Sequence, residues 1–120
     1  MLINELSKRS GLSIHTIRYY ENLGLIQGIS DEKVKSNNYK SYDENVIERL
    51  EIIIEAKEVG FTLTEIKKIL IAWFESVDSK PETHELFQSK IKEIDVKMKH
   101  FKQTRKLLEE VCAKLQNDSL

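Results

Sequence analysis

The chain has 120 residues, of which 32% are charged and 8% aromatic, with one Pro, four Gly and a formal net charge of −1. This length allows one small domain with an appendage but not two independent hydrophobic cores, and the composition favours a helical protein with much solvated surface. No apolar N-terminal segment of signal-peptide type and no long uncharged run occurs, so the sequence supports neither secretion nor a membrane span.

Residues 6–26 predict a short helix, a turn centred on Gly11 and a second helix. The apolar residues on either side of the glycine fall at helical intervals; they are Ile3, Leu6, Leu12, Ile17 and Leu23. Ser13 is a good N-cap for the second helix, because its side-chain oxygen can accept a hydrogen bond from a backbone N–H one turn later. The pattern is that of a helix-turn-helix.

The exposed face of the second predicted helix carries side chains that suit DNA, namely His15, Thr16, Arg18, Tyr19 and Tyr20. Arginine pairs with guanine edges or phosphates, and threonine and tyrosine hydroxyls reach backbone oxygens. The net charge argues weakly against DNA binding, although the first 42 residues hold six Lys and Arg against four Asp and Glu. Similar helix pairs occur in proteins that never bind nucleic acid, and two adjacent tyrosines can be core residues, so both interpretations stay open.

A polar and charged segment follows at residues 30–41, and it predicts a hairpin-sized loop with a turn at Asn37–Asn38. In a winged helix-turn-helix, a loop of this kind lies along the DNA backbone. The alternative is a surface loop without a function.

Two more helices are predicted between residues 43 and 74, and each has its own start signal. Asp43 is a suitable N-cap for the first helix, which extends to about Val59, where Gly60 stops it. The stretch Thr62-Leu63-Thr64-Glu65 is a capping box that starts the second. Near its end lie Trp73 and Phe74, which we expect in the core rather than in a ligand pocket.

A connector is predicted at residues 75–82, followed by a long helix from about Thr83 to Gln116. Steps alternating between four and three residues along this helix meet apolar side chains at every position except Arg105, which indicates a coiled-coil seam. The seam consists of Phe87, Ile91, Ile94, Met98, Phe101, Arg105, Leu108, Cys112 and Leu115. Because an exposed apolar stripe needs a partner and the chain has no second long helix of this kind, the economical partner is a second copy.

Two sequence signatures resemble those of the MerR family of bacterial transcription regulators. The first is Thr16-Ile17-Arg18-Tyr19-Tyr20-Glu21 followed by Gly24-Leu25-Ile26, and the second is Val59-Gly60-Phe61-Thr62-Leu63-Thr64-Glu65-Ile66. The resemblance covers Met1 to about Phe74 by motif and the remainder by architecture. It implies a mainly α fold: a winged helix-turn-helix DNA-binding domain at residues 1–75, a connector at 76–82, and a long antiparallel coiled-coil dimerisation helix with a short tail at 83–120.

The resemblance also implies the DNA contacts. It places a wing at residues 36–42, where Asn38 replaces a common Gly and Lys40 a common Arg, and it gives Lys57 a phosphate contact, for which an ordinary solvated lysine is the alternative. The expected contact residues are Ser13, His15, Thr16, Arg18, Tyr19, Tyr20, Tyr39, Lys40 and Lys57. The implied mechanism is a homodimer on a pseudo-palindromic promoter that bends and untwists the DNA, so that RNA polymerase, an indirect partner, can use both promoter elements.

Metal-sensing members of that family place thiolates near both ends of the dimerisation helix, whereas this chain has one cysteine, Cys112. A soft-metal site of that kind is therefore not expected, no cofactor is assigned, and the inducer stays unknown. If the antiparallel helices cross near Met98, Cys112 of one copy lies opposite His84 of the other, as an incomplete zinc-like or redox-sensitive site. The alternative, which we favour, is that Cys112 packs as a small hydrophobic residue. A single cysteine fits a reducing cytoplasm.

Two other functions are compatible with the sequence. One is a coiled-coil adaptor whose N-terminal helices bind protein, and the other is an architectural DNA-bending factor without an effector. An enzyme is the poorest fit, because the spacings assemble no Ser/His/Asp or Cys/His constellation and no phosphate-binding glycine loop.

Overall fold

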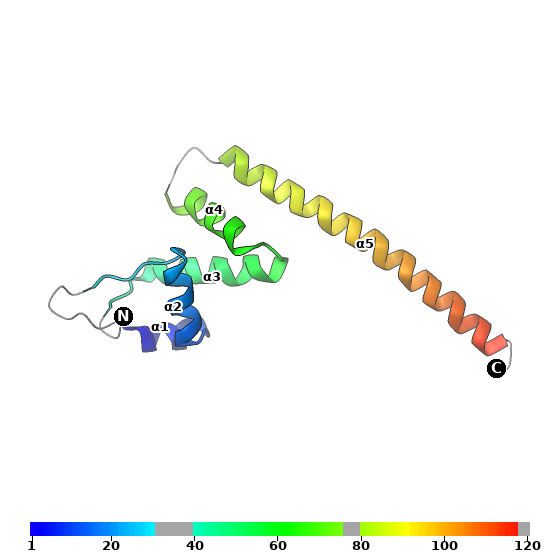
Figure 1. Cartoon of the computed structure of the whole chain (residues 1–120), viewed down its shortest axis with the longest axis horizontal. Helices are drawn as coiled ribbons and strands as arrows, with labels where there is room; N and C mark the ends of the chain where they lie inside the picture. Colours follow the sequence, from blue (N-terminus) through cyan, green and yellow to red (C-terminus); the bar gives the residue numbers. More distant parts are fainter. Residues whose placement is uncertain (31–39, 76–79, 118–120) are drawn as a thin grey trace. The chain divides into compact units, whose positions relative to one another are not determined.

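The computed structural model describes residues 1–30, 40–75 and 80–117 of the chain (Figure 1). The helices in these ranges are α1 (Ile3–Ser10), α2 (Ile14–Asn22), α3 (Glu44–Val59), α4 (Leu63–Phe74) and α5 (Lys80–Asn117). They form two compact units, Met1–Lys80 and Pro81–Leu120, which are described separately below. The mainly α fold class is therefore confirmed, whereas most of the predicted wing, including Tyr39, lies outside the described residues.

Local capping explains where the helices of the first unit begin and end. The Ser13 hydroxyl oxygen accepts the Thr16 N–H at 3.1 Å, and Asp43 caps α3 in the same way, as predicted. The Thr62 hydroxyl accepts the Glu65 N–H at 3.2 Å and the Glu65 carboxylate accepts the Thr62 N–H at 2.9 Å, which confirms the capping box. Gly11 and Gly60 close α1 and α3 in the left-handed conformation, at φ 76° and 105°.

A single core holds the first unit together. Helix α1 packs against both α2 and α3, and α4 packs against α3. The most deeply buried large side chains are Leu6, Ile17, Leu25, Tyr42, Leu50, Ile53, Ile66 and Leu70. Because α2 contributes only its Ile17 side to this core, its opposite side remains available at the surface.

Two expectations about aromatic residues are wrong. Tyr20 does not lie on the exposed face of α2, because its side chain is only 4% exposed and belongs to the core. Trp73 is not in the core, because its side chain is 71% exposed at the end of α4. The neighbouring Phe74 is half-buried, with the Arg49 guanidinium carbon 4.6 Å from its ring centroid.

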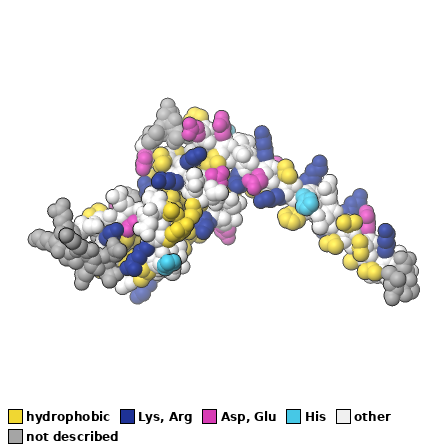
Figure 2. Space-filling model, viewed as in Figure 1, with side chains coloured by type: hydrophobic (Ala, Val, Ile, Leu, Met, Phe, Trp, Pro, Cys, Tyr) yellow, Lys and Arg dark blue, Asp and Glu magenta, His cyan; other side chains and the backbone are white. Residues whose placement is uncertain are grey.

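The second unit contains all but the first residue of the 38-residue helix α5, which begins at Lys80, earlier than predicted. Most of its apolar residues are exposed, among them Phe87, Met98, Phe101 and Leu108. Figure 2 shows hydrophobic side chains along one side of this helix and Lys and Arg side chains along the other. Among the described residues, no helix is long and apolar enough to span a membrane.

Candidate nucleic-acid interface

The outward side of α2 carries three of the predicted DNA-contacting residues. His15 and Tyr19 are exposed, the latter by 48%, and Thr16 is half-buried. The Ser13 hydroxyl, besides capping the helix, donates a hydrogen bond to Thr16 Oγ1 at 2.9 Å. Hydroxyl and imidazole groups therefore gather at the start of α2, the end that enters the major groove in helix-turn-helix proteins.

Arg18 lies on the flank of the same helix and is half-buried, with its Nε atom removed from solvent. Its positive charge acts on the Tyr42 hydroxyl, where it favours the ionised form and so lowers the pKa, a smaller effect than the burial that raises it. Arg18 therefore acts electrostatically on a core tyrosine of the first unit, and its contact with DNA stays a prediction.

A second cation from a different helix lies beside α2. The Lys57 ammonium, near the end of α3, is 5.9 Å from the centroid of the Tyr20 ring. Lys57 is exposed, so its charge remains accessible to a ligand. The structure therefore brings Lys57 next to the helix that carries the other predicted contacts.

The described residues on either side of segment 31–39 pair next to α2. Ile29 and Ser41 form an isolated antiparallel bridge, with N–H···O distances of 2.8 and 2.9 Å in the two directions. Lys40, for which a phosphate contact stays a prediction, places its ammonium 3.0 Å from the Glu21 carboxylate. Its side chain is 28% exposed and that of Glu21 is 14% exposed.

Glu21 is a functional candidate that sequence reasoning missed. Its Oε1 atom accepts the Gly28 N–H at 3.1 Å, its Oε2 atom accepts from Lys40, and the Tyr42 hydroxyl also forms a hydrogen bond with it. Burial and this carboxylate raise the pKa of Tyr42 to about 12. The one available signal was a carboxylate in the last turn of a helix, where the helix dipole disfavours it.

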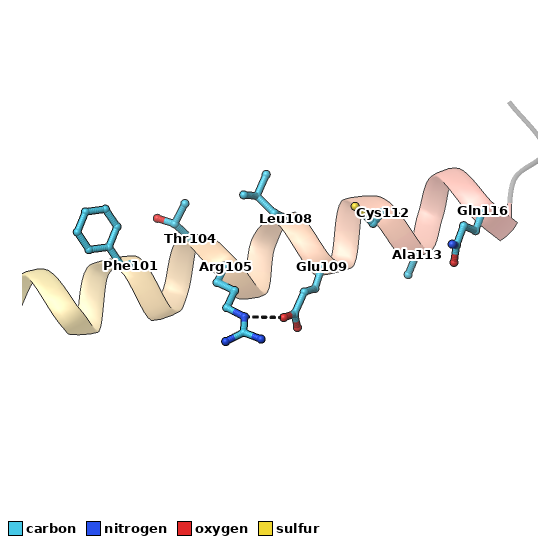
Figure 3. A pocket seen from close by; sticks show the side chains of 8 residues that line it. All are labelled: Phe101, Thr104, Arg105, Leu108, Glu109, Cys112, Ala113 and Gln116. Carbon is cyan, nitrogen blue, oxygen red and sulfur yellow. Dashed lines mark hydrogen bonds and ion pairs between the residues drawn. The ribbon is translucent and has the colours of Figure 1, made fainter.

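The predicted effector residues lie on α5. Cys112 is exposed and belongs to a shallow groove on one face of the helix, with Phe101 and Leu108 pointing to the same side (Figure 3). Arg105, the one charged residue of the predicted seam, forms an ion pair of 3.0 Å with Glu109. His84 is exposed, and within the described ranges no three His, Cys, Asp or Glu side chains gather into a metal site. The meeting of Cys112 with His84 across a dimer stays a prediction.

Comparison with known proteins identifies the relatives of the chain. A family model described as "MerR HTH family regulatory protein" matches residues 1–72, and one described as "MerR, DNA binding" matches residues 47–111. The chain is 31% identical over 109 residues to the transcriptional regulator HmrR of Rhizobium leguminosarum bv. viciae, covering 91% of this chain and 81% of that protein. It is 33% identical over 110 residues to a ZntR homolog of Haemophilus influenzae, covering 91% of this chain and 79% of that protein.

Two solved structures share the fold. The regulator PbrR691 from Ralstonia metallidurans CH34, in complex with lead(II), superposes with a TM-score of 0.75 at 26% identity, covering 95% of this chain and 86% of that one. HiNmlR, described as a MerR family regulator lacking the sensor domain and bound to promoter DNA, has a TM-score of 0.65 at 22% identity, covering 98% and 91%. The chain belongs to the MerR family of DNA-binding transcriptional regulators.

Proposed function

We propose that this regulator works as a homodimer on a pseudo-palindromic promoter site, with α2 of each copy in a major groove. The observation that carries this proposal is that the two units expose different kinds of surface. The first unit has one surface helix with polar, DNA-compatible side chains, and the second is a long helix with an unburied apolar face. One copy supplies one reading helix, so a two-fold pair reads two half-sites.

The apolar face of α5 supports pairing through this helix. Met98 is 63% exposed, Phe101 68% and Leu108 59%. All three residues occupy positions of the predicted seam. Burying one such side chain contributes roughly 1.5–3 kcal/mol, so burial of the seam favours pairing against the entropy cost of association. The antiparallel direction of the pair follows from the family resemblance.

On the DNA side, the proposed contacts come from α2 and the end of α3. His15, Thr16 and Tyr19 face outward and are assigned to base edges and phosphates, with Arg18 beside them. The exposed Lys57 ammonium is assigned to a phosphate next to the same groove. Ser13 holds the start of α2 by its capping bond, so any DNA contact it makes comes through its remaining hydrogen-bonding capacity.

The proposed regulatory step is a change in DNA shape rather than in occupancy. A dimer with a fixed separation between its two α2 helices binds best to DNA whose groove spacing matches that separation. Deforming a promoter by bending costs roughly 1–6 kcal/mol, which lies within the range that protein contacts supply. An effector that alters the α5 pair would shift this separation and so make the promoter usable by RNA polymerase.

The test is selection of binding sites from a random double-stranded DNA library, followed by mobility shifts on the recovered site. We expect a pseudo-palindrome, and we expect Arg18→Ala to lose about 1–3 kcal/mol of binding free energy per half-site. Arg18→Lys, which keeps the charge but not the planar fork, is expected to lose less. Lys106→Ala on the outer side of α5 is the matched control and should bind like the wild type.

Assembly is tested separately by sedimentation equilibrium. Leu108→Glu places a charge in the proposed seam and is expected to give monomers, whereas Lys106→Glu makes a comparable change on the outer side and should leave dimers. Recovery of a single, non-repeated half-site, or a monomeric wild type, would contradict the proposal.

A further inference from the structure

We infer that Glu21 is a positioning residue that ties the residues on both sides of segment 31–39, Gly28 and Lys40, to the last turn of α2, and that Lys40 serves this carboxylate rather than a DNA phosphate. This inference rests on DNA binding through α2. It goes beyond that function because it reassigns a residue expected at the DNA backbone and gives a role to a carboxylate on the reading helix.

The hydrogen-bond donors around Glu21 come from both sides of the segment. The Gly28 N–H, which precedes the segment, donates to Oε1 at 3.1 Å. The Lys40 ammonium, which follows it, donates to Oε2 at 3.0 Å, and Tyr42 hydrogen-bonds the same carboxylate. The bridge between Ile29 and Ser41 lies between these contacts. One side chain of α2 therefore fixes where the chain leaves for the segment and where it returns.

Close packing leaves this cluster little freedom to rearrange. A Cβ atom at Gly28 would lie 2.8 Å from Tyr42 Cε1 and 3.1 Å from Glu21 Oε1, so only glycine lets the backbone approach this closely. The Tyr42 ring is 1% exposed, and its main chain exchanges hydrogen bonds of 2.7 and 2.8 Å with Met1. The ring cannot move aside without opening the core.

The position of Glu21 on its helix also points to a role outside helix stability. A carboxylate near the C-terminal end of a helix opposes the helix dipole, so this residue disfavours α2 unless donors surround it. A negative charge on a DNA-reading helix would also repel phosphates. The Lys40 ammonium neutralises the charge of Glu21 locally. The pair of side chains therefore adds no net positive charge to the protein surface that faces the DNA.

The inference makes a specific statement about salt dependence. A lysine that contacts a phosphate releases a counterion from the DNA. Replacing that lysine therefore makes the negative slope of log Kobs against log salt shallower, by about 0.9 per contact, and a lower slope below means a slope of smaller magnitude. A lysine that only positions the chain lowers affinity when removed but leaves the slope unchanged. The slope therefore separates the two roles even where both variants bind more weakly.

The experiment measures binding to the selected site over a range of salt concentrations for the wild type, Lys40→Met, Glu21→Gln and the double variant. We expect each single variant to weaken binding by about tenfold, as loss of a charged hydrogen bond predicts. The double variant should bind no worse than either single one, because both changes break the same contact. All four slopes should agree, whereas Lys57→Met, the phosphate-contact control, should lower the slope.

Several outcomes would overturn the inference. A lower slope for Lys40→Met, together with tighter binding for Glu21→Gln, would show that Lys40 contacts phosphate and that Glu21 restrains it. Equal affinities for all four proteins would show that the cluster has no role in binding. If Glu21→Gln fails to fold, the slope of Lys40→Met decides alone, and Lys40→Arg should restore affinity. Failure of the wild type to bind would refute the proposed function instead.

Discussion

Replacing Tyr42 by phenylalanine removes one oxygen atom from the core and leaves the buried ring in place. The Tyr42 side chain is 1% exposed, and its hydroxyl is hydrogen-bonded to the Glu21 carboxylate. A hydrogen bond to a charged group contributes roughly 1.5–3 kcal/mol to stability. We therefore expect Tyr42→Phe to lower the free energy of unfolding by about 2 kcal/mol at neutral pH.

The pH dependence of stability in the wild type, compared with that of the variant, gives a second value. Burial, followed by the hydrogen bond and charge of Glu21, raises the pKa of Tyr42 from 10.0 to about 12. Because the folded-state pKa lies above the unfolded-state pKa, the stability linked to this proton is fully present below the unfolded pKa. It is lost as the pH rises from the unfolded to the folded pKa. A shift of this size corresponds to roughly 2–3 kcal/mol.

The assay is urea unfolding of both full-length proteins, followed by circular dichroism at one fixed protein concentration, because any association of α5 makes stability concentration-dependent. The free-energy difference between wild type and Tyr42→Phe should stay constant up to about pH 10 and shrink as the pH rises from about 10 to about 12. Absorbance titration should also show, in the wild type but not in Tyr42→Phe, a tyrosine that ionises near pH 12. Equal stability at neutral pH, or a difference that does not change with pH, would refute the reasoning.

Three further changes test other contacts by the same unfolding assay. Thr62→Ala removes the capping-box acceptor and should cost about 1 kcal/mol, most of which Thr62→Ser should restore. Arg49→Leu removes the cation over the Phe74 ring and a hydrogen bond to a main-chain carbonyl, for an expected loss of about 1–2 kcal/mol, with Arg49→Lys intermediate. Glu44→Gln breaks an exposed ion pair with Arg9, and this ion pair lowers the pKa of Glu44. The loss of stability should therefore be small, should be complete only above the ordinary glutamate pKa, and should fade in high salt. A larger loss than for Arg49→Leu would contradict this ranking.

Most of the first unit was predictable from sequence because its helix ends depend on local chemistry. The Ser13 and Asp43 caps and the Thr62 capping box each involve hydrogen bonds within three residues along the chain. Gly11 and Gly60 end helices through their own backbone conformation. Signals of this range are present in the sequence itself, so they survive without knowledge of the tertiary structure.

The burial of individual aromatic residues was not predictable in the same way. Neighbouring positions on a helix point about 100° apart, so Tyr19 and Tyr20 cannot both face the core. The one that does is decided by where α1 and α3 pack, which the local pattern does not contain. Trp73 follows the apolar spacing of α4, yet Phe74 is the residue that turns toward Arg49. Periodicity identifies an apolar face but not how far the core extends along it.

The cluster around Glu21 was also beyond local reasoning. Its donors on Gly28 and Lys40 are 7 and 19 residues away in the sequence, and no spacing rule connects them. Considered singly, Glu21 is only the last residue of the stretch Thr16–Glu21 of the first signature, and Lys40 is a basic residue of the kind that contacts phosphates. Their pairing emerges only when the returning chain is placed beside α2, so their roles depend on tertiary structure.

The solvent-exposed indole at the end of α4 gives the protein a built-in optical probe. The chain contains one tryptophan, and that residue is 71% exposed, so its emission comes from a single, water-surrounded site. Any ligand, second copy or DNA-induced rearrangement that covers Trp73 would move its fluorescence maximum to shorter wavelength and reduce quenching by iodide. Events at the end of α4 can therefore be followed in the unlabelled protein, in real time and without altering a residue.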